Sequence, residues 1–167
     1  NAAGPWVKTV LNERLAQPSR DAVRLVKGSH IVLPKLYEGE HAFILQNDDR
    51  RVVFMIPYGD LHTLVGTTDV PVQDEDARPE ASAQEIAYLC RAVNRYLARP
   101  ARPEEVVWKY AGVRPLYDDG KSDPSSITRD YVLELDDQAG KAPVLSLFGG
   151  KITTYRRLAE TALAKLA

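Results

Sequence analysis

Apolar residues recur at helical spacing in three segments of the chain, near its start, its middle and its end. These segments predict helices over residues 5–16, 82–98 and 150–166. Pro5 suits the first turn of the first helix, because the N–H that proline lacks needs no partner there. Ser82 and Glu85 have the spacing of a capping box. The middle segment is therefore the best-defined amphipathic helix of the sequence.

Between these segments lie short runs rich in β-branched and aromatic residues. Such runs cover residues 23–33, 41–46, 52–56, 61–67, 106–113, 127–135 and 144–148. Polar turns separate many of them, so we expect an antiparallel or mixed sheet of about five to seven strands. The polar segments 70–80 and 118–126 are expected to be loops. The predicted fold class is α+β, a mostly antiparallel or mixed sheet with flanking helices.

Composition and charge exclude several classes of protein. The chain has 167 residues, of which 44% are hydrophobic and 27% charged, as is ordinary for a globular domain. Its longest unbroken apolar run, Val52 to Ile56, is far shorter than the roughly 20 residues of a membrane helix. The net charge of −1 lacks the basic excess of a nucleic-acid-binding face. A single cysteine, Cys90, excludes an internal disulfide and a cysteine-based zinc site, and the three histidines lack metal-ligand spacing.

The two ends of the chain have the character of cut ends. The sequence begins at Asn1 without a methionine or a signal-peptide pattern, and it stops inside the last helical pattern. A free-standing module would be expected to begin and end at loops. We therefore expect this chain to be a piece of a longer protein.

The strongest local chemical signal is the double glycine between the last strand and the last helix. Gly149 and Gly150 would let the backbone approach a ligand closely. The N–H groups of the helix start, with Lys151 and Thr153, favour an anion or a polar oxygen. A tight strand-to-helix turn with a solvated lysine is the alternative. The spacing is not that of a P-loop, so a nucleoside triphosphate is not expected.

Two arginines, one histidine and one threonine in strand patterns are further candidates. Arg114 and Arg129 can each hold a phosphate or carboxylate through two parallel hydrogen bonds. His30 can accept a hydroxyl proton near neutral pH. Thr67, within the segment 66–69, can line a polar pocket or belong to a turn. Structural alternatives stay open, namely an ion pair for Arg129 and a hydrogen-bonded core position for His30.

Six short motifs together resemble one family, the FAD-dependent glycerol-3-phosphate dehydrogenases. They lie in the family's order at residues 1–6, 27–30, 66–69, 112–115, 128–131 and 148–156. The resemblance covers nearly the whole chain. It implies the substrate domain of a D-amino-acid-oxidase-like flavoprotein at 18–142, with the tail of the FAD domain at 1–17 and a return to it at 143–167. Most of the FAD domain is missing, including its Gly-x-Gly-x-x-Gly unit.

The resemblance also assigns roles to the candidate residues. It implies oxidation of sn-glycerol 3-phosphate to dihydroxyacetone phosphate, with hydride transfer to FAD and electrons passed to a quinone. The implied residues are His30 and Arg114 for catalysis, Arg129, Lys151 and Thr67 for substrate, and Gly149, Gly150, Lys151 and Thr153 for cofactor. No metal is implied.

The resemblance places the complete protein in the cytoplasm, at the periphery of the inner membrane. The isolated chain is expected to bind no FAD, to be inactive and to self-associate through apolar faces left uncovered. Two alternatives remain: an amine- or amino-acid-oxidising flavoprotein of the same superfamily, and a non-catalytic anion-binding module. A Gly-x-Gly-x-x-Gly unit in flanking sequence would favour a flavoenzyme over the module.

Overall fold

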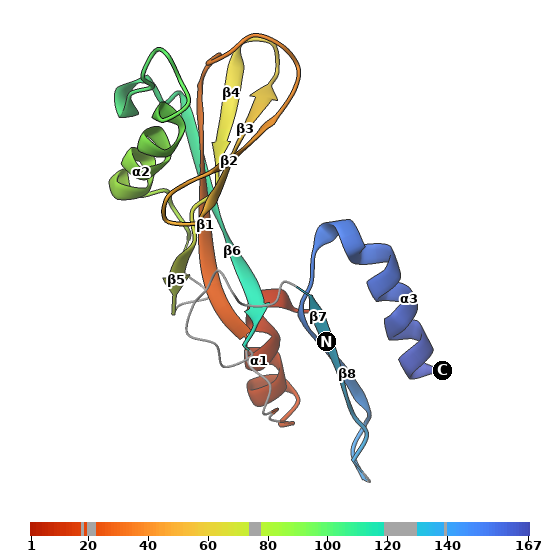
Figure 1. Cartoon of the computed structure of the whole chain (residues 1–167). Helices are drawn as coiled ribbons and strands as arrows, with labels where there is room; N and C mark the ends of the chain where they lie inside the picture. Colours follow the sequence, from red (N-terminus) through yellow and green to blue (C-terminus); the bar gives the residue numbers. More distant parts are fainter. Residues whose placement is uncertain (18, 20–22, 74–77, 119–129, 139) are drawn as a thin grey trace. The chain divides into compact units, whose positions relative to one another are not determined.

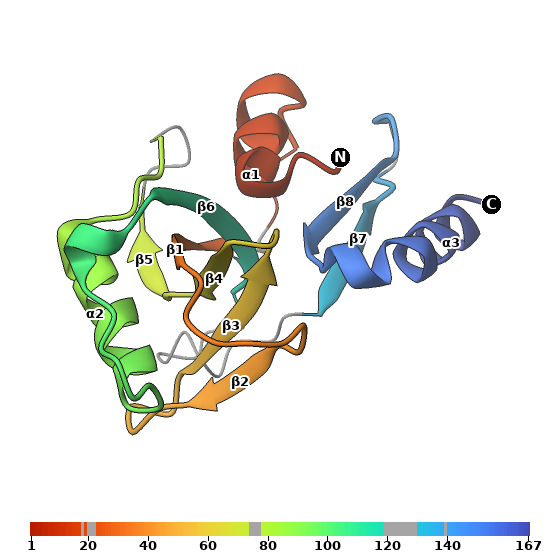
Figure 2. The same cartoon turned by 90° about the horizontal axis from the view of Figure 1, so that it is seen from above.

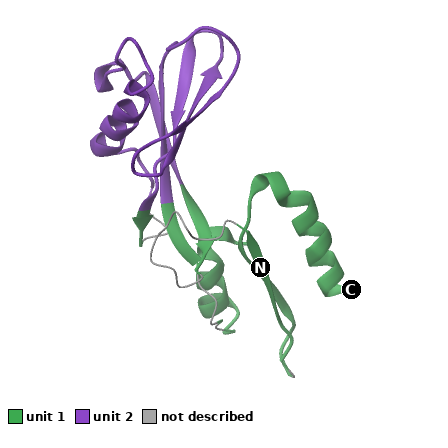
Figure 3. Ribbon diagram, in the orientation of Figure 1, with its two compact units in different colours: residues 1–26, 71–76, 113–167 green, residues 27–70, 77–112 purple. Residues whose placement is uncertain are grey.

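The computed structural model describes residues 1–17, 19, 23–73, 78–118, 130–138 and 140–167. They form two compact units, coloured separately in Figure 3. Unit 1 comprises residues 1–26, 71–76 and 113–167, and unit 2 comprises residues 27–70 and 77–112. Each unit is described by itself. The expected domain segments 1–17, 18–142 and 143–167 concern the complete protein and stay a prediction.

The main sheet is six-stranded and its meander lies in unit 2 (Figure 1). Its strands are β1 (Val23–Pro34), β2 (Phe43–Gln46), β3 (Val52–Tyr58), β4 (His62–Gly66), β5 (Val70–Val72) and β6 (Trp108–Tyr117). The strand order is β2-β3-β4-β1-β5, with β6 paired to β1. β2 pairs antiparallel with β3, β3 with β4, and β4 with β1. The predicted α+β class with a mostly antiparallel sheet is thereby confirmed.

One face of this sheet is covered by helix α2 (Ala83–Asn94), as Figure 2 shows. Alternate strand residues point toward the helix, which follows from the two-residue period of a β-strand. The resulting core consists of Ile31, Leu33, Leu45, Val53, Met55 and Val65 from the strands, and Leu89, Cys90, Ala92 and Val93 from the helix. The opposite face of β3 carries exposed apolar side chains.

The end of α2 and the segment 70–80 differ from expectation. Helix α2 ends at Asn94 instead of residue 98, because the Asn94 amide bonds both backbone groups of Ala101 and turns the chain. The segment 70–80, expected to be a loop, contributes β5 at its beginning. The predicted capping box is confirmed, since Ser82 Oγ accepts from the Glu85 N–H and Glu85 bonds the Ser82 N–H.

Unit 1 contains the ends of the chain and a separate two-stranded sheet. Its first helical segment comprises η1 (Gly4–Trp6), α1 (Val7–Thr9) and η2 (Val10–Arg14). Strands β7 (Tyr131–Asp136) and β8 (Val144–Gly149) pair antiparallel, and η5 (Ile152–Thr154) leads into α3 (Tyr155–Leu166). Val7 and Leu11 of this helical segment pack with Phe148 of β8 in a small buried cluster. The last two described strands thus form a sheet of their own, apart from the six-stranded sheet.

Some expectations fall on residues that the structure does not describe. The predicted loop at 118–126 and the start of the predicted strand at 127–135 lie mostly outside the described residues. Among the described helices, none has the length and apolar character needed to cross a bilayer.

Candidate functional site

The open face of the unit 2 sheet carries His30. The strand register sets Ile44 opposite Phe54, Phe54 opposite Gly66, and Gly66 opposite His30, so these four residues form one row across β2, β3, β4 and β1. Ile44 is 70% exposed and Phe54 39%. Apolar surface of this kind, gathered on one face, is typical of a surface that binds a ligand or is covered by other protein.

Aromatic side chains from β6 and β3 continue this face beside His30. The rings of His30 and Tyr110 are stacked, with centroids 4.8 Å apart and planes within 3°. The ring centroids of Trp108 and Tyr110 are 5.3 Å apart, and those of Tyr58 and Trp108 are 6.3 Å apart. Sequence reasoning missed this aromatic row. Its signal was present in β3, where an unbroken apolar run predicts a strand with apolar side chains on both faces.

Thr67 lies one residue beyond the row that contains His30. It directly follows Gly66, the Cα partner of His30, and the Gly66–Thr67 peptide is cis. The Thr67 hydroxyl donates to the Thr68 carbonyl at 3.2 Å. The structure therefore places Thr67 directly after the residue that pairs with His30, and the hydroxyl makes a local turn-type hydrogen bond.

Three polar residues of the motifs at 27–30 and 66–69 surround one buried carboxylate, that of Glu85. Its Oε1 accepts from Ser29 Oγ at 2.7 Å and from Thr68 Oγ1 at 2.8 Å. Its Oε2 lies 2.8 Å from Lys27 Nζ and also accepts from Ser82 Oγ at 2.9 Å. Lys27, Ser29 and Thr68 are thus structural, and Glu85 ties β1, the end of β4 and the start of α2 together.

The surroundings keep the Glu85 carboxylate ionised. Burial by itself raises the pKa of Glu85, but the Lys27 ammonium and the donors around the carboxylate outweigh burial and lower the pKa to about 2. The residue is 6% exposed. A buried charge of this kind is tolerated only when it is paired and hydrogen-bonded, as here.

In unit 1, backbone conformation and packing already require glycine at both positions of the double glycine. Gly149 has φ +75°, and a Cβ there would lie 2.8 Å from the Asp130 carbonyl oxygen. Gly150 has φ +104°, and its Cβ would lie 3.2 Å from Leu158 Cδ1. Both positions therefore need glycine for backbone conformation and packing, so the structural alternative holds for these two residues whatever else they do.

The residues after the double glycine form an open, positively polarised surface. Lys151 and Thr153 are exposed, and Ile152 is 88% exposed. Helix α3 begins without a side-chain cap and without an acidic residue in its first turn. The N–H groups of Thr154 and Tyr155 bond the carbonyls of Lys151 and Ile152, so the helical segment starts at η5. N–H groups at such a start, with Lys151 beside them, favour a negatively charged or polar group. This arrangement keeps the binding interpretation of Lys151 and Thr153 open.

Of the two candidate arginines, the structure describes Arg114 but not Arg129. Arg114 is half-buried on β6, three residues before Tyr117, whose ring lies 6.5 Å from that of Phe148 at the end of β8. The strand that carries Arg114 therefore reaches the double-glycine turn within unit 1. Arg129 lies outside the described residues.

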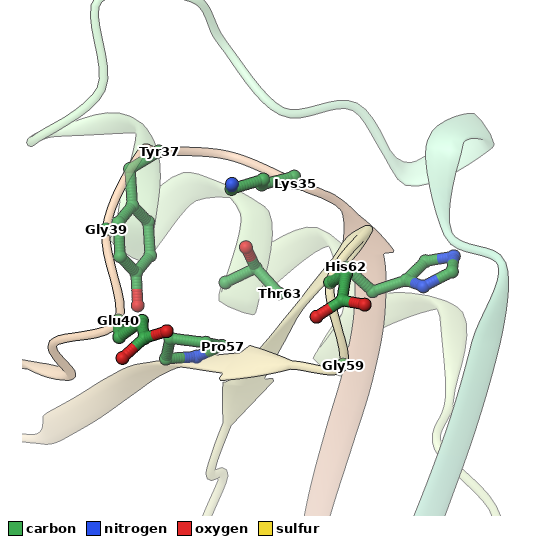
Figure 4. A pocket seen from close by; sticks show the side chains of 9 residues that line it. Lys35, Tyr37, Gly39, Glu40, Pro57, Gly59, His62 and Thr63 are labelled. Carbon is green, nitrogen blue, oxygen red and sulfur yellow. The ribbon is translucent and has the colours of Figure 1, made fainter.

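A pocket of about 200 Å³ lies at the other end of the unit 2 sheet, around the turn between β3 and β4 (Figure 4). Lys35, Tyr37, His62 and Thr63 are among its lining residues. The Lys35 ammonium bonds the exposed Glu38 carboxylate at 2.8 Å. His62 pairs with Pro34, four residues along β1 from His30. None of the candidate site residues from the sequence lines this pocket.

Metal and thiol chemistry find no support among the residues that the structure describes. No group of three His, Cys, Asp or Glu side chains gathers there as metal ligands. Cys90 is buried in the core under α2, and burial raises the pKa of its thiol. The side chain is a packing element.

Comparison with known proteins gives concordant matches over nearly the whole chain. The family model DAO, FAD dependent oxidoreductase, matches residues 1–156. The glycerol-3-phosphate dehydrogenase of Pseudomonas aeruginosa is 52% identical over 166 residues, which are 99% of this chain and 32% of that protein. The D-erythritol 1-phosphate dehydrogenase of Brucella abortus is 49% identical over 166 residues, 99% of this chain and 33% of that protein.

The fold is also found in a solved structure. The X-ray structure of the glycerol-3-phosphate dehydrogenase from Bacillus halodurans complexed with FAD matches with a TM-score of 0.77 and 28% identity. The match covers 100% of this chain and 31% of that one. The chain thus spans about a third of the length of the relatives it matches.

Proposed function

Because this chain belongs to the FAD-dependent oxidoreductase family, we propose that the complete protein oxidises glycerol 3-phosphate to dihydroxyacetone phosphate. The observation that carries this proposal is the 52% identity, over 99% of the chain, with a protein named glycerol-3-phosphate dehydrogenase. The six sequence motifs and the FAD-bound structural neighbour agree with it. In the complete protein, this chain supplies the substrate side of the site.

The residues after the double glycine fit FAD. The start of η5, the exposed Lys151 and the Thr153 hydroxyl offer donors to the polar edge of a flavin ring. Gly149 and Gly150 shape the turn that presents these donors. FAD, when bound, supplies the acceptor for the hydride. The isolated chain lacks the Gly-x-Gly-x-x-Gly unit that would hold the pyrophosphate, so we expect FAD in the complete protein only.

His30 and Arg114 act on the secondary alcohol. A ring nitrogen of His30 takes the hydroxyl proton, which suits an imidazole at neutral pH. The resemblance of the motifs assigns the Arg114 guanidinium to stabilising the negative charge that develops on the reacting oxygen. Apolar side chains around His30 lower the local polarity, which strengthens the hydrogen bond between the alcohol and the imidazole.

The phosphate of the substrate needs cations, which Arg129 and Lys151 supply, while Thr67 contributes a hydroxyl beside His30. A quinone receives the electrons, and the complete protein works at the cytoplasmic periphery of the inner membrane. These last assignments rest on the resemblance of the motifs.

The proposal is tested with the complete protein that contains this chain. We expect it to purify with bound flavin and to reduce an artificial electron acceptor in the presence of glycerol 3-phosphate, but not glycerol. D-erythritol 1-phosphate is the decisive comparator, since a relative of nearly equal identity is named for it. A preference for that substrate, for an amino acid or for an amine would refute the proposed substrate. A protein without flavin and without turnover would favour the non-catalytic anion-binding module.

Substitutions then separate the roles of the charged residues. His30→Asn should lower kcat by roughly 100-fold or more, the scale of a positioned acid–base group. Arg114→Lys keeps the charge but loses the planar fork, and should lower kcat. Arg129→Ala should mainly raise KM, because uniform binding of phosphate stabilises ground and transition states alike. If the two arginine variants show the opposite patterns, their roles are exchanged, and if neither changes the kinetics both are structural.

A further inference from the structure

The ring of His30 occupies space that any residue other than glycine at position 66 would fill. A Cβ built on Gly66 would lie 2.0 Å from His30 Cδ2 and 2.6 Å from His30 Nε2. The φ of Gly66 lies outside the left-handed region that favours glycine. The absence of a side chain here therefore serves the imidazole, which lies over β4 where the side chain of residue 66 would otherwise stand.

Tyr110 holds the same ring from the neighbouring strand on the opposite edge of β1. β4 pairs with β1, and β6 pairs with β1 as well, so the His30 ring has a strand to each side. The Tyr110 and His30 rings are parallel within 3° at 4.8 Å, a stacked geometry of the kind that aromatic pairs adopt. Trp108 and Tyr58 extend this aromatic row behind Tyr110.

We propose that Tyr110 and Gly66 are positioning residues that fix the plane of the His30 imidazole for proton transfer. Gly66 gives the ring room over β4, and Tyr110 stacks on it and restricts rotation about its side-chain bonds. The catalytic part of this inference rests on the proposed function of His30. A proton acceptor held in a single orientation avoids the loss in rate that a displacement of about 1 Å can cause.

Tyr110 can act by stacking on the imidazole or merely by covering apolar surface, and substitutions at position 110 distinguish these two roles. Tyr110→Phe keeps the ring and loses the hydroxyl, so it should leave the orientation of His30 unchanged. Tyr110→Leu keeps an apolar side chain and loses the ring, so it should release the imidazole. Tyr96→Leu is the matched control, because Tyr96 lies in the same unit, is 49% exposed and bonds the Gln46 carbonyl.

The first measurement needs no substrate. In this chain, the imidazole proton resonances of His30, assigned with His30→Asn, should carry a ring-current shift from Tyr110. We expect that shift to persist in Tyr110→Phe and Tyr96→Leu and to disappear in Tyr110→Leu. Gly66→Ala should also alter it, because an ordinary contact distance of 3.4 Å requires the ring to move by roughly 1 Å or more. Resonances unchanged by Tyr110→Leu would overturn the proposal.

The second measurement uses the complete protein, with rates normalised to bound flavin. Tyr110→Leu should lower kcat by roughly 10-fold and Gly66→Ala by roughly 100-fold, with KM nearly unchanged, since misplacing an acid–base group affects the chemical step. Tyr110→Phe should restore the rate. If Tyr110→Leu keeps the wild-type kcat, Tyr110 is not a positioning residue. A complete protein that does not oxidise glycerol 3-phosphate refutes the proposed function instead, while the ring-current shift still decides how His30 is held.

Discussion

Replacing Glu85 with glutamine keeps the shape of the side chain and removes its charge. The variant leaves the half-buried Lys27 ammonium without its carboxylate partner, which lies 2.8 Å away in the wild type. It also sets an amide group against the N–H and hydroxyl of Ser82, both of which donate to the carboxylate. Because Glu85 connects three segments of unit 2, we expect the substitution to lower the free energy of unfolding of the whole unit.

The magnitude follows from the pKa of Glu85. A fall from the ordinary value of 4.5 to about 2 corresponds to about 3 to 3.5 kcal/mol of stability, at roughly 1.4 kcal/mol per pKa unit. The folded-state pKa lies below the unfolded one, so this contribution is fully present above about pH 5 and is lost as the pH falls toward 2. Glu85→Gln should therefore be about 3 kcal/mol less stable at pH 7, and the gap should narrow at low pH.

Urea unfolding at pH 7, 5, 4 and 3 tests this expectation. A Trp6→Phe background leaves Trp108 as the only tryptophan, so its fluorescence reports on unit 2. Glu105→Gln is the matched control, because Glu105 also bonds the backbone N–H three residues earlier and pairs with Arg99 near the surface. Such an exposed pair should contribute less than about 1 kcal/mol. Equal losses in the two variants, or a gap for Glu85→Gln that does not change with pH, would refute the reasoning.

Three further predictions concern unit 1, the end of α2 and the cofactor. Gly149→Ala should lower Tm and cost about 2 kcal/mol or more, through its positive φ and its approach to the Asp130 carbonyl; Gly140→Ala, with a similar φ and no atom within 4 Å of its Cβ, isolates the conformational part. Asn94→Ala should cost about 1–3 kcal/mol in urea unfolding, because it leaves the buried backbone of Ala101 without its two bonds. The isolated chain should purify without flavin absorbance, and near-stoichiometric FAD would contradict this.

Local patterns in the sequence were sufficient for most of the secondary structure. The period of apolar positions predicted α2 and α3, and the β-rich runs predicted seven of the eight described strands. The spacing of Ser82 and Glu85 predicted the capping box, because that motif involves only residues three apart. β5 was missed, since three residues containing a proline carry too little signal. The motif order gave the family, which the comparisons confirm.

The partners of each side chain were decided by the tertiary structure. A β pattern states which residues share a face, but not which strand lies beside them or in what register. That Tyr110 would stack on His30, eighty positions earlier, and that Gly66 would lie opposite that ring, depended on β4 and β6 both pairing with β1. In the same way, the sequence identified Glu85 as a cap, and only the packing of α2 onto the sheet placed its carboxylate among Lys27, Ser29 and Thr68. Contacts between distant segments depend on the register and packing of the whole sheet, and no local window of the sequence contains them.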